Sequence, residues 1–568
     1  MLTLHVKALV FGSAVAGTLA LPAHSQERTA LLTEGSTVPG FPGAVVDSIS
    51  NTAVNGTGGR AVSSNVDDGT GTILSLVWGR AASGDVDGVL FQEGTFGTCE
   101  QTSWEGFFGL ADDGSVFYSP SCNDTVTLET SLDNVFLDSV PIAEEGQPIA
   151  SLPGKVFRFN SRPTILASGD PVWIGGINDE LTGDSEGNGL FFGTGQTALL
   201  KTGDQPPNVA FPLDGSAVDF DFRFSPDGTQ YITLVDMLSG SSLNDGRVVL
   251  NGAGLDVAGA PVEEQTQVPA SVGGLSGEAW DNFDFFGILD NGIFLMTGDT
   301  DGNTATDEFV FFDGAMLYRE GDTLADGHVL AGSIEGASLA PNGDLGLVWD
   351  IEDGAGSDIE AVIFNGRVVA KEGDAIDTNG DGIVDPNATI VSFSGISSLT
   401  TATDQRLYVT AEIDLLGTTT TLDDMEVYLE ITVSPFEDLG GTEEISLSAG
   451  GSQELSLFLP REFEADFYLV LGSASGTMPG TPAGSLNLPL NFDAYTQFTL
   501  ESVNSSILSP SFGAFDAFNT ASTTFLIPPG SNPAVAGSTL HHAYITLDLS
   551  SVIDIQFVSE AIPVTLIP

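Results

Sequence analysis

Basic side chains are scarce in this chain. Lysine and arginine together number 15 against 78 acidic residues in 568, for a formal charge of −63. This excess disfavours nucleic acid, whose phosphates need basic partners, and anionic lipid for the same reason. The acids are dispersed among turns, so a disordered acidic tail is not expected. Two compatible interpretations stay open: adaptation to a salty medium, where net charge keeps a protein soluble, and dispersed calcium sites.

Cysteine and histidine are also rare. The two cysteines, Cys99 and Cys122, flank a predicted strand around 116–118, and in an exported protein this arrangement predicts a disulfide. Two cysteines alone cannot form a zinc site. After residue 25 the histidines are His328, His541 and His542, and no nucleophile elbow, metalloprotease helix or phosphate loop occurs. We therefore predict no catalytic and no cofactor-binding residues.

Long apolar runs are missing except at the N-terminus. Lys7 precedes an apolar stretch from Ala8 to Leu21, and the small residues Ala23 and Ser25 follow. This layout predicts a signal peptide over 1–25. A membrane anchor is the alternative, although about 14 apolar residues are short for a span. We expect an exported protein, secreted or at the cell surface, with no transmembrane segment in the mature chain.

Glycine turns are abundant and recur along the first three quarters of the chain. An apolar pair leads into a turn glycine seven times, at Gly35, Gly94, Gly146, Gly203, Gly259, Gly321 and Gly373. A second turn follows most of them, as in Asp112–Gly114 and Asp290–Gly292. Two markers in one register, with a period above about 40 residues and short strands between turns, indicate propeller blades.

The clearest repeat predicts four antiparallel strands. They cover 283–289, 293–296, 309–312 and 316–318, and the acidic loop 299–307 separates the second from the third. The marker strand 29–32 has no partner of its own near the N-terminus, and joining it to the last repeat would close a ring. We predict a seven-bladed β-propeller over 28–433; an open or irregular β-array is the alternative.

The sequence changes character after Ser434. Residues 435–568 contain no lysine, tryptophan or cysteine, and segments such as 454–459 and 543–549 alternate between apolar and polar residues. This alternation is typical of strands with one buried face. We therefore predict an all-β protein in which a C-terminal β-sandwich over 435–568 follows the propeller.

Two segments resemble known families. The segment 55–62, from Asn55 to Val62, resembles the core of exported bacterial tandem-repeat proteins named for an N-x-x-G-x-x-A-F motif, with Val62 in place of the final Phe. Other copies, such as 111–117, keep the glycine but lose the Asn and Ala. Segments 472–480 and 488–495 resemble a C-terminal module of exported planctomycete-type proteins. Neither family has an established catalytic motif, so the resemblance implies an exported, surface-associated protein.

Two acidic loops are candidate calcium sites. The first offers oxygens at positions 1, 3, 5 and 9 around a turn glycine, with the carbonyl at position 7 as a further ligand. Its residues are Asp377, Asn379, Asp381, Ile383 and Asp385. The second has the same spacing but lacks the turn glycine, and comprises Asp299, Asp301, Asn303 and Asp307. An acidic turn that binds nothing is the alternative for both.

These features favour an exported, calcium-stabilised, non-catalytic binding or structural protein, with an extracellular polysaccharide or a surface protein as partner. The alternative function is a polysaccharide-active hydrolase or lyase that uses carboxylates on the propeller face. The five tryptophans, all within the repeats, are interpreted as core residues; stacking on sugars is the alternative.

Overall fold

The computed structural model describes residues 27–568 apart from eleven short gaps. These are 216–221, 239–244, 325, 353–355, 394–398, 416–423, 439–441, 461–462, 464–466, 517–518 and 549–553. The described chain forms two compact units, Glu27–Thr432 and Val433–Pro568. Strands dominate both, so the all-β prediction is confirmed. The signal peptide predicted over 1–25 lies outside the described residues.

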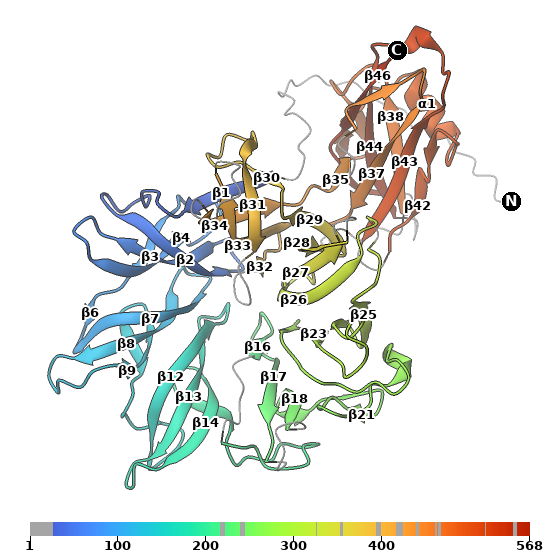
Figure 1. Cartoon of the computed structure of the whole chain (residues 1–568). Helices are drawn as coiled ribbons and strands as arrows, with labels where there is room; N and C mark the ends of the chain where they lie inside the picture. Colours follow the sequence, from blue (N-terminus) through green and yellow to red (C-terminus); the bar gives the residue numbers. More distant parts are fainter. Residues whose placement is uncertain are drawn as a thin grey trace. The chain divides into compact units, whose positions relative to one another are not determined.

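Seven sheets of four or more strands follow one another along the described part of Glu27–Thr432 (Figure 1). The first contains β2 (Val45–Val54), β3 (Arg60–Asp67), β4 (Ile73–Arg80) and β5 (Gly88–Gln92). The second contains β6 (Thr95–Phe96), β7 (Cys99–Leu110), β8 (Val116–Asp124), β9 (Leu132–Asp133), β10 (Val135–Leu137) and β11 (Val140–Ala143). The third contains β12 (Lys155–Ile165), β13 (Pro171–Asp179), β14 (Ser185–Phe192) and β15 (Thr197–Lys201).

The next three sheets repeat the antiparallel order. The fourth contains β16 (Phe222–Phe224), β17 (Tyr231–Asp236), β18 (Gly246–Leu250) and β19 (Ala253–Gly254), and a hairpin of β20 (Asp256–Val257) and β21 (Ala260–Pro261) follows it. The fifth contains β22 (Phe286–Ile288), β23 (Phe294–Gly298), β24 (Phe309–Phe312) and β25 (Ala315–Arg319), close to the four strands predicted for this repeat. The sixth contains β26 (Leu330–Leu339), β27 (Leu345–Glu352), β28 (Asp358–Phe364) and β29 (Arg367–Lys371).

The seventh sheet joins the two ends of this unit. It contains β30 (Ala375–Ile376), β31 (Asp385–Phe393), β32 (Thr400–Thr401), β33 (Arg406–Asp414) and β34 (Asp424–Thr432), and β1 (Glu27–Thr33) lies antiparallel to β34. Leu32 pairs with Tyr428 in this register. The prediction that the first marker strand adds to the last sheet is thus confirmed. The edge of β34 is paired with β1 and is not left open.

Apolar side chains between neighbouring sheets form the core of this unit. One cluster combines Leu32, Tyr408 and Tyr428 of the seventh sheet with Val62 and Trp78 of the first. Four of the five tryptophans, Trp78, Trp173, Trp280 and Trp349, are at most 2 % exposed. Their interpretation as core residues is confirmed, which removes four of the five as stacking platforms for sugars.

The marker turns connect each sheet to the next. Gly321 and Gly373 adopt φ of 85° and 83°, the left-handed region that glycine enters without strain. Their N–H groups donate to the carbonyls of Leu330 (2.8 Å) and Ile390 (2.9 Å) in the following sheet. The marker at Gly259 is a correction, because this glycine lies in the β20–β21 hairpin. Gln265, with φ 59°, takes the equivalent place and donates to the carbonyl of Trp280 at 2.7 Å.

The second unit contains two sheets with a shared core. The first has β35 (Phe436–Asp438), β37 (Gly451–Phe458), β43 (Thr520–Ile527) and β41 (Leu508–Ser509). The second has β36 (Glu444–Ser446), β46 (Ile562–Ile567), β44 (Thr539–Asp548), β38 (Phe467–Ser473) and β42 (Phe512–Ala514), with β45 (Asp554–Val558) beside β44. A separate pair, β39 (Thr481–Ala483) and β40 (Leu486–Leu488), lies between β38 and the helix in sequence. Leu457 and Phe525 of the first sheet and Val470 and Tyr544 of the second belong to one apolar cluster.

A helix is the unexpected element of the second unit. α1 (Ala494–Glu501) begins where the sequence resembles the planctomycete-type module, and Asp493 caps it by accepting the N–H groups of Tyr495 and Thr496. This carboxylate satisfies helix donors that have no partner within the helix. Tyr495 contacts the fully buried His542 of β44, with Oη 2.9 Å from Nε2. Burial lowers the pKa of His542 to about 3, so its imidazole is neutral and structural.

Candidate binding cavity and acidic cluster

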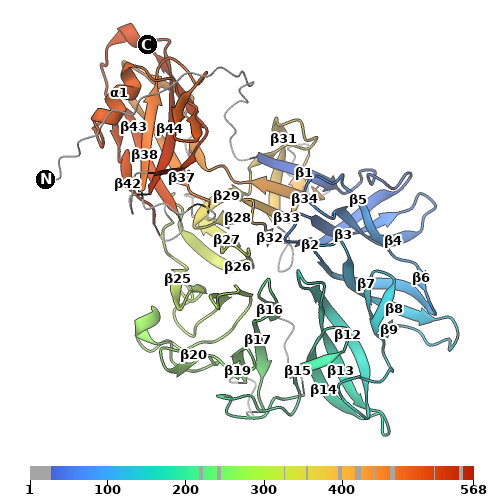
Figure 2. The same cartoon turned by 180° about the vertical axis from the view of Figure 1, so that it is seen from behind.

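The innermost strands of the first unit surround a cavity of about 510 Å³. Every one of the seven sheets contributes to its wall, through residues at or just after the ends of β2, β7, β12, β16, β22, β26 and β32. Figure 2 shows β2, β7, β12, β16, β26 and β32 from behind, at the inner side of their sheets. A volume of this size accommodates a ligand of a few sugar units or a comparable small molecule.

Bulges in the innermost strands shape the cavity wall. The register of β2, β7 and β12 shifts between Ile49 and Thr52, between Trp104 and Phe108, and between Ser161 and Thr164. A bulge bends a strand and redirects a side chain, and such features concentrate next to binding sites. At the third of these bulges Arg162 has φ 50°, a conformation that non-glycine residues adopt at an energetic cost.

Among the described lining residues, the charge of the cavity wall is the reverse of the charge of the chain. Two arginines, Arg162 and Arg223, line it, and Asp112 is the one carboxylate among the described lining residues. Asp112 accepts the N–H of Gly56 at 2.7 Å, which commits one of its oxygens to a turn. The guanidinium of Arg162 lies 3.9 Å from the ring centre of Phe107. Such stacking holds a guanidinium in place at little cost in hydration.

Asn55, the first residue of the N-x-x-G-x-x-A-F-like segment, organises one rim of the cavity. Its side-chain oxygen accepts the N–H groups of Thr57 (3.1 Å) and Gly59 (2.6 Å). Its amide donates to the carbonyls of Ala81 and Ala111, both at 2.8 Å. All its strong hydrogen-bonding positions are therefore used within the fold. Asn55 is a structural residue that joins the turn of the first sheet to the turn of the second.

In the fifth, sixth and seventh sheets, a glutamate at the start of the third strand connects the sheet to its neighbour. We call Glu308, Glu360 and Glu426 the junction glutamates. Glu360 accepts the N–H of Phe393 and Glu426 accepts the N–H of Ile49, both from the innermost strand of the next sheet, and Glu308 lies close to the N–H of Ile334 in the corresponding place. The marker residue Glu372 in turn accepts the N–H of Glu360 at 2.9 Å. Carboxylates thus satisfy backbone donors that the strand bulges leave without ladder partners.

Carboxylates gather around each junction glutamate. Burial, followed by the neighbouring charges of Asp299 and Asp284, raises the pKa of Glu308 to about 9. Burial raises the pKa of Glu360 and of Glu426 as well, with further contributions from Glu372 and Glu34, respectively. Loss of solvation and like charges both disfavour the ionised form of a carboxyl group. These junctions therefore hold protons more tightly than exposed carboxyls do.

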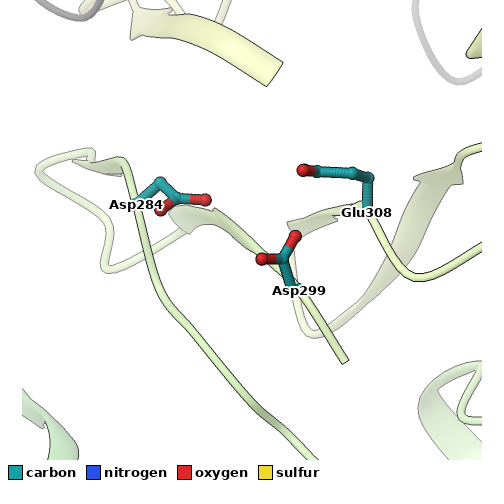
Figure 3. Close-up of side chains that lie close together, drawn as sticks. All are labelled: Asp284, Asp299 and Glu308. Atoms are coloured by element: carbon teal, nitrogen blue, oxygen red, sulfur yellow. The ribbon is translucent and has the colours of Figure 1, made fainter. Parts of the chain in front are cut away.

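The densest of these groups is the acidic cluster Asp284, Asp299 and Glu308. One oxygen of each lies within 4.8 Å of the others, and Figure 3 shows the three side chains directed toward one another. Glu308 Oε2 is buried and has no hydrogen-bond partner among the described residues. The cluster can share a proton or, with further ligands, hold a hard cation.

The first predicted calcium loop is closed by its own hydrogen bonds. Asp377, which is 3 % exposed, accepts the N–H groups of Asn379 (3.0 Å) and Gly380 (2.8 Å) through one oxygen and of Gly382 (2.7 Å) through the other. Asn379 and Asp381 accept the N–H groups of Asp381 and Ile383, both within 3.0 Å. Asp385 accepts from Thr378, and the Ile383 side chain is 69 % exposed.

The second predicted loop contributes one residue to the acidic cluster. Asp299 belongs to it, whereas Asp301 accepts the N–H of Ala279 at 2.6 Å, outside the cluster. Asn303 and Asp307 use their backbone carbonyls within the loop, as acceptors for Thr306 (2.7 Å) and Thr300 (3.1 Å). The cluster partners Asp284 and Glu308 are residues that loop spacing could not find. The one available signal was the recurrence of glutamate before an apolar third strand, at 308, 360 and 426.

Two other features of the sequence have clear positions. The predicted disulfide forms between Cys99 and Cys122 and links β7 to β8, with Cα atoms 5.2 Å apart. His328 lies beside Asp326, with Nδ1 3.1 Å from Oδ1, in the turn that precedes β26. Within the described residues, no helix has the length and apolar character of a membrane span.

No family model matches the chain, and no curated protein matches it. Solved structures with partial likeness include a prolyl endopeptidase, with 11 % identity, TM-score 0.35, and coverage of 86 % of this chain and 62 % of that one. A second is PorZ, a surface component of the type-IX secretion system of Porphyromonas gingivalis, with 12 % identity, TM-score 0.31 and coverage of 92 % and 71 %.

A third is the α-L-arabinanase of Penicillium chrysogenum complexed with arabinobiose, with 10 % identity, TM-score 0.26 and coverage of 72 % and 99 %. This chain spans less than two thirds of the length of the prolyl endopeptidase. At these scores the likenesses do not assign an activity.

Proposed function

We propose that this protein is an exported binding protein whose first unit is a seven-bladed β-propeller and whose second unit is a β-sandwich. The observation that carries the binding function is the cavity at the centre of the seven sheets. Its described wall offers hydroxyl, amide and guanidinium groups but a single carboxylate, Asp112. Paired-carboxylate hydrolysis needs two such groups, so this wall favours binding over cleavage.

Export is part of the proposal. The Cys99–Cys122 disulfide is consistent with an oxidising, extracellular compartment, where such bonds persist. The signal-peptide layout of residues 1–25 supports the same conclusion from sequence. An extracellular polysaccharide is the partner that a cavity rich in hydroxyl and amide groups would suit, because these groups pair with sugar hydroxyls.

Calcium remains a proposal for the two predicted loops. If calcium binds the 377–385 loop, a chelator should lower the melting temperature, and Asp381→Ala should remove most of that difference. Differential scanning calorimetry with and without EGTA measures both quantities. An identical melting curve in chelator and in calcium would exclude a stabilising calcium ion.

A polysaccharide hydrolase or lyase is the second candidate, and one observation favours it. In the acidic cluster a carboxyl group that stays protonated near neutral pH, Glu308, lies beside Asp299 and Asp284. A protonated and an ionised carboxyl side by side are the groups that glycoside hydrolysis uses. The arabinanase among the similar structures gives a first substrate to try.

One experiment separates the two functions. The purified protein is incubated with arabinan and with a panel of plant and marine polysaccharides, and both retention and released sugars are scored. Retention without products supports binding. Ala167→Trp, which places a large side chain at an exposed position of the cavity wall, should abolish retention, whereas Ala536→Trp, exposed in the second unit, should not.

Released sugars that disappear in Glu308→Gln would establish the hydrolase or lyase instead. Retention that is unchanged by Ala167→Trp would place the ligand outside the cavity and overturn the proposed site.

A further inference from the structure

The basic residues of this protein are distributed in a way that points to the ligand of the cavity. Seven of the described basic side chains pair with carboxylates: Arg28, Arg60, Lys155, Lys201, Arg247, Arg319 and Arg406. In a chain with 78 acidic residues such pairing is the expected outcome. Four other described basic residues, Arg80, Arg158, Arg223 and Lys371, have no carboxylate within ion-pair distance among the described residues, and of these four Arg223 is the one that lines the cavity.

Arg223 is exposed and held at the cavity wall. Its Nη1 donates to the carbonyl of Phe222 at 2.8 Å, which fixes one side of the guanidinium group and leaves other N–H donors available. The adjacent ring of Phe224 also lines the cavity and stacks on Tyr231, with ring centres 5.3 Å apart. A guanidinium that is already partly fixed loses less conformational freedom when it binds an anion.

Arg162 places a second guanidinium group at the cavity wall. The left-handed backbone at this residue costs free energy, and a glycine would avoid that cost, as Gly106 does with φ 81° at the bulge of β7. The arginine side chain is nevertheless present, and it stacks on Phe107 inside the cavity wall. This backbone conformation is kept for a side chain whose contacts within the fold include the Phe107 ring.

We propose that the central cavity binds a saccharide that carries a carboxylate, with Arg162 and Arg223 as the groups that recognise the anion. This inference rests on the proposed binding function and adds the chemical class of the ligand. Arginine forms paired, charge-assisted hydrogen bonds with a carboxylate, and the threonine side chains of the wall suit the sugar hydroxyls. Asp112, already bonded to Gly56, adds one negative charge to the two positive ones.

The charge of the whole chain limits the form of this ligand. The net charge of −63 repels long polyanions at low salt. At physiological ionic strength this repulsion is screened beyond about 8 Å, whereas the contacts inside the cavity persist. The site therefore suits a short acidic oligosaccharide or the end of a chain better than the interior of a long polyuronate.

The test compares two probes that differ in the carboxylate. Isothermal titration calorimetry in 0.15 M NaCl measures binding of trigalacturonate and of the neutral galactotriose to the full mature protein. We expect trigalacturonate to bind at least about tenfold more tightly, and Arg223→Gln to remove most of this preference, since a charge-assisted hydrogen bond to a carboxylate is worth a tenfold change or more. Arg162→Lys keeps the charge but loses the planar group, and should weaken trigalacturonate binding by a smaller factor.

Arg158→Gln is the matched control. Arg158 is an exposed arginine of β12, the strand that also contains Arg162. It lies outside the cavity wall, and its Nη1 donates to Ser185 Oγ at 3.0 Å. This variant should bind both probes like the unaltered protein. Equal affinity for the two probes, or an unchanged preference in Arg223→Gln with an unchanged melting curve, would overturn the ligand class while leaving the proposed binding function intact. Retention of no saccharide in the polysaccharide panel would overturn the binding function itself.

Discussion

The two halves of an innermost strand of the first unit have different neighbours. The first half contacts carboxylates of the adjacent sheet, and the second half lines the cavity. In β2, the N–H of Ile49 donates to Glu426 of the neighbouring sheet, whereas the wall of the cavity begins at Asn51. In β26 the same change occurs between Ile334, whose N–H lies close to Glu308, and Ala337, which lines the cavity. A bulge in each strand separates the two halves.

One strand can thus both hold two neighbouring sheets together and line the cavity. The bulge frees an N–H that a carboxylate of the next sheet accepts, and it redirects the residues that follow toward the centre. The acids are thereby drawn to the junctions and away from the cavity. The junctions should accordingly respond to pH, and the cavity to changes in its turns and arginines.

The largest expected effect concerns the second sheet, which supports the cavity wall through the end of β7. Cys99→Ser combined with Cys122→Ser opens a disulfide between residues 23 apart, and we expect the free energy of unfolding to fall by about 3 kcal/mol. Chemical denaturation measures this loss. Because the junction glutamates lie in other sheets, the dependence of stability on pH should stay the same. Free thiols in the freshly purified native protein would contradict the disulfide itself.

A somewhat smaller effect is expected from Asn55→Ala. The substitution removes five side-chain hydrogen bonds at the cavity rim, of which the one to the carbonyl of Ala111 joins the first sheet to the second, and it leaves the carbonyls of Ala81 and Ala111 without this donor. We expect a loss of about 2–3 kcal/mol in the free energy of unfolding and weaker retention of polysaccharide. Asn55→Asp keeps the acceptor but not the donor, so its free energy of unfolding should lie between those of the unaltered protein and Asn55→Ala. Full stability of Asn55→Ala would show that the rim does not depend on this residue.

The effect of pH tests the junctions as a group. Burial, with Glu335 and other neighbouring acids, raises the pKa of Asp350 to about 6, and that of Glu308 is about 9. A carboxyl whose pKa is higher in the folded state stabilises the fold when it is protonated, and this contribution disappears as the pH rises through the folded-state pKa. We therefore expect the melting temperature to rise when the pH is lowered from about 9 to about 6.

Below that pH range, stability should change with pH in the opposite direction. Hydrogen bonds from the loop backbone, together with Lys155, lower the pKa of Asp179 to about 2, and hydrogen bonds from Thr229 do the same for Asp227. Their stabilising contribution is lost only as the pH falls below about 4. Calorimetry across the whole range should thus show a maximum of stability in mildly acidic solution. A melting temperature that increases steadily from pH 6 to pH 9 would contradict the assignment of protonated junctions.

The sequence predicted what depends on local periodicity. The four strands of the fifth sheet, the addition of 29–32 to the last sheet and the disulfide all follow from alternation, turn glycines and cysteine spacing. It could not locate contacts between distant segments. Glu308 contacts a strand that begins more than about 20 residues later, and nothing in the local pattern of 299–307 distinguishes Asp299 from Asp301.

Two local features were also missed, for different reasons. Gly259 has the spacing of a marker, but an inserted hairpin moved the equivalent turn to Gln265, where a non-glycine residue adopts the same left-handed conformation. The helix α1 is short and has almost no apolar periodicity, so the pattern of its residues did not predict it. Both cases show that turn chemistry outside glycine is harder to find by pattern.

The smallest expected effect isolates one junction. Glu308→Gln keeps an amide oxygen close to the N–H of Ile334 and removes the carboxylate that repels Asp299 and Asp284 when ionised. At about pH 9 the variant should be more stable than the unaltered protein by on the order of 1 kcal/mol, a partly solvent-screened repulsion, and near pH 6 the difference should vanish because Glu308 is then protonated. Glu180→Gln, an exposed substitution in the third sheet, should change stability at neither pH. If Glu308→Gln is instead less stable at both pH values, the carboxylate is required in its ionised form, and a bound cation rather than a proton would balance the cluster.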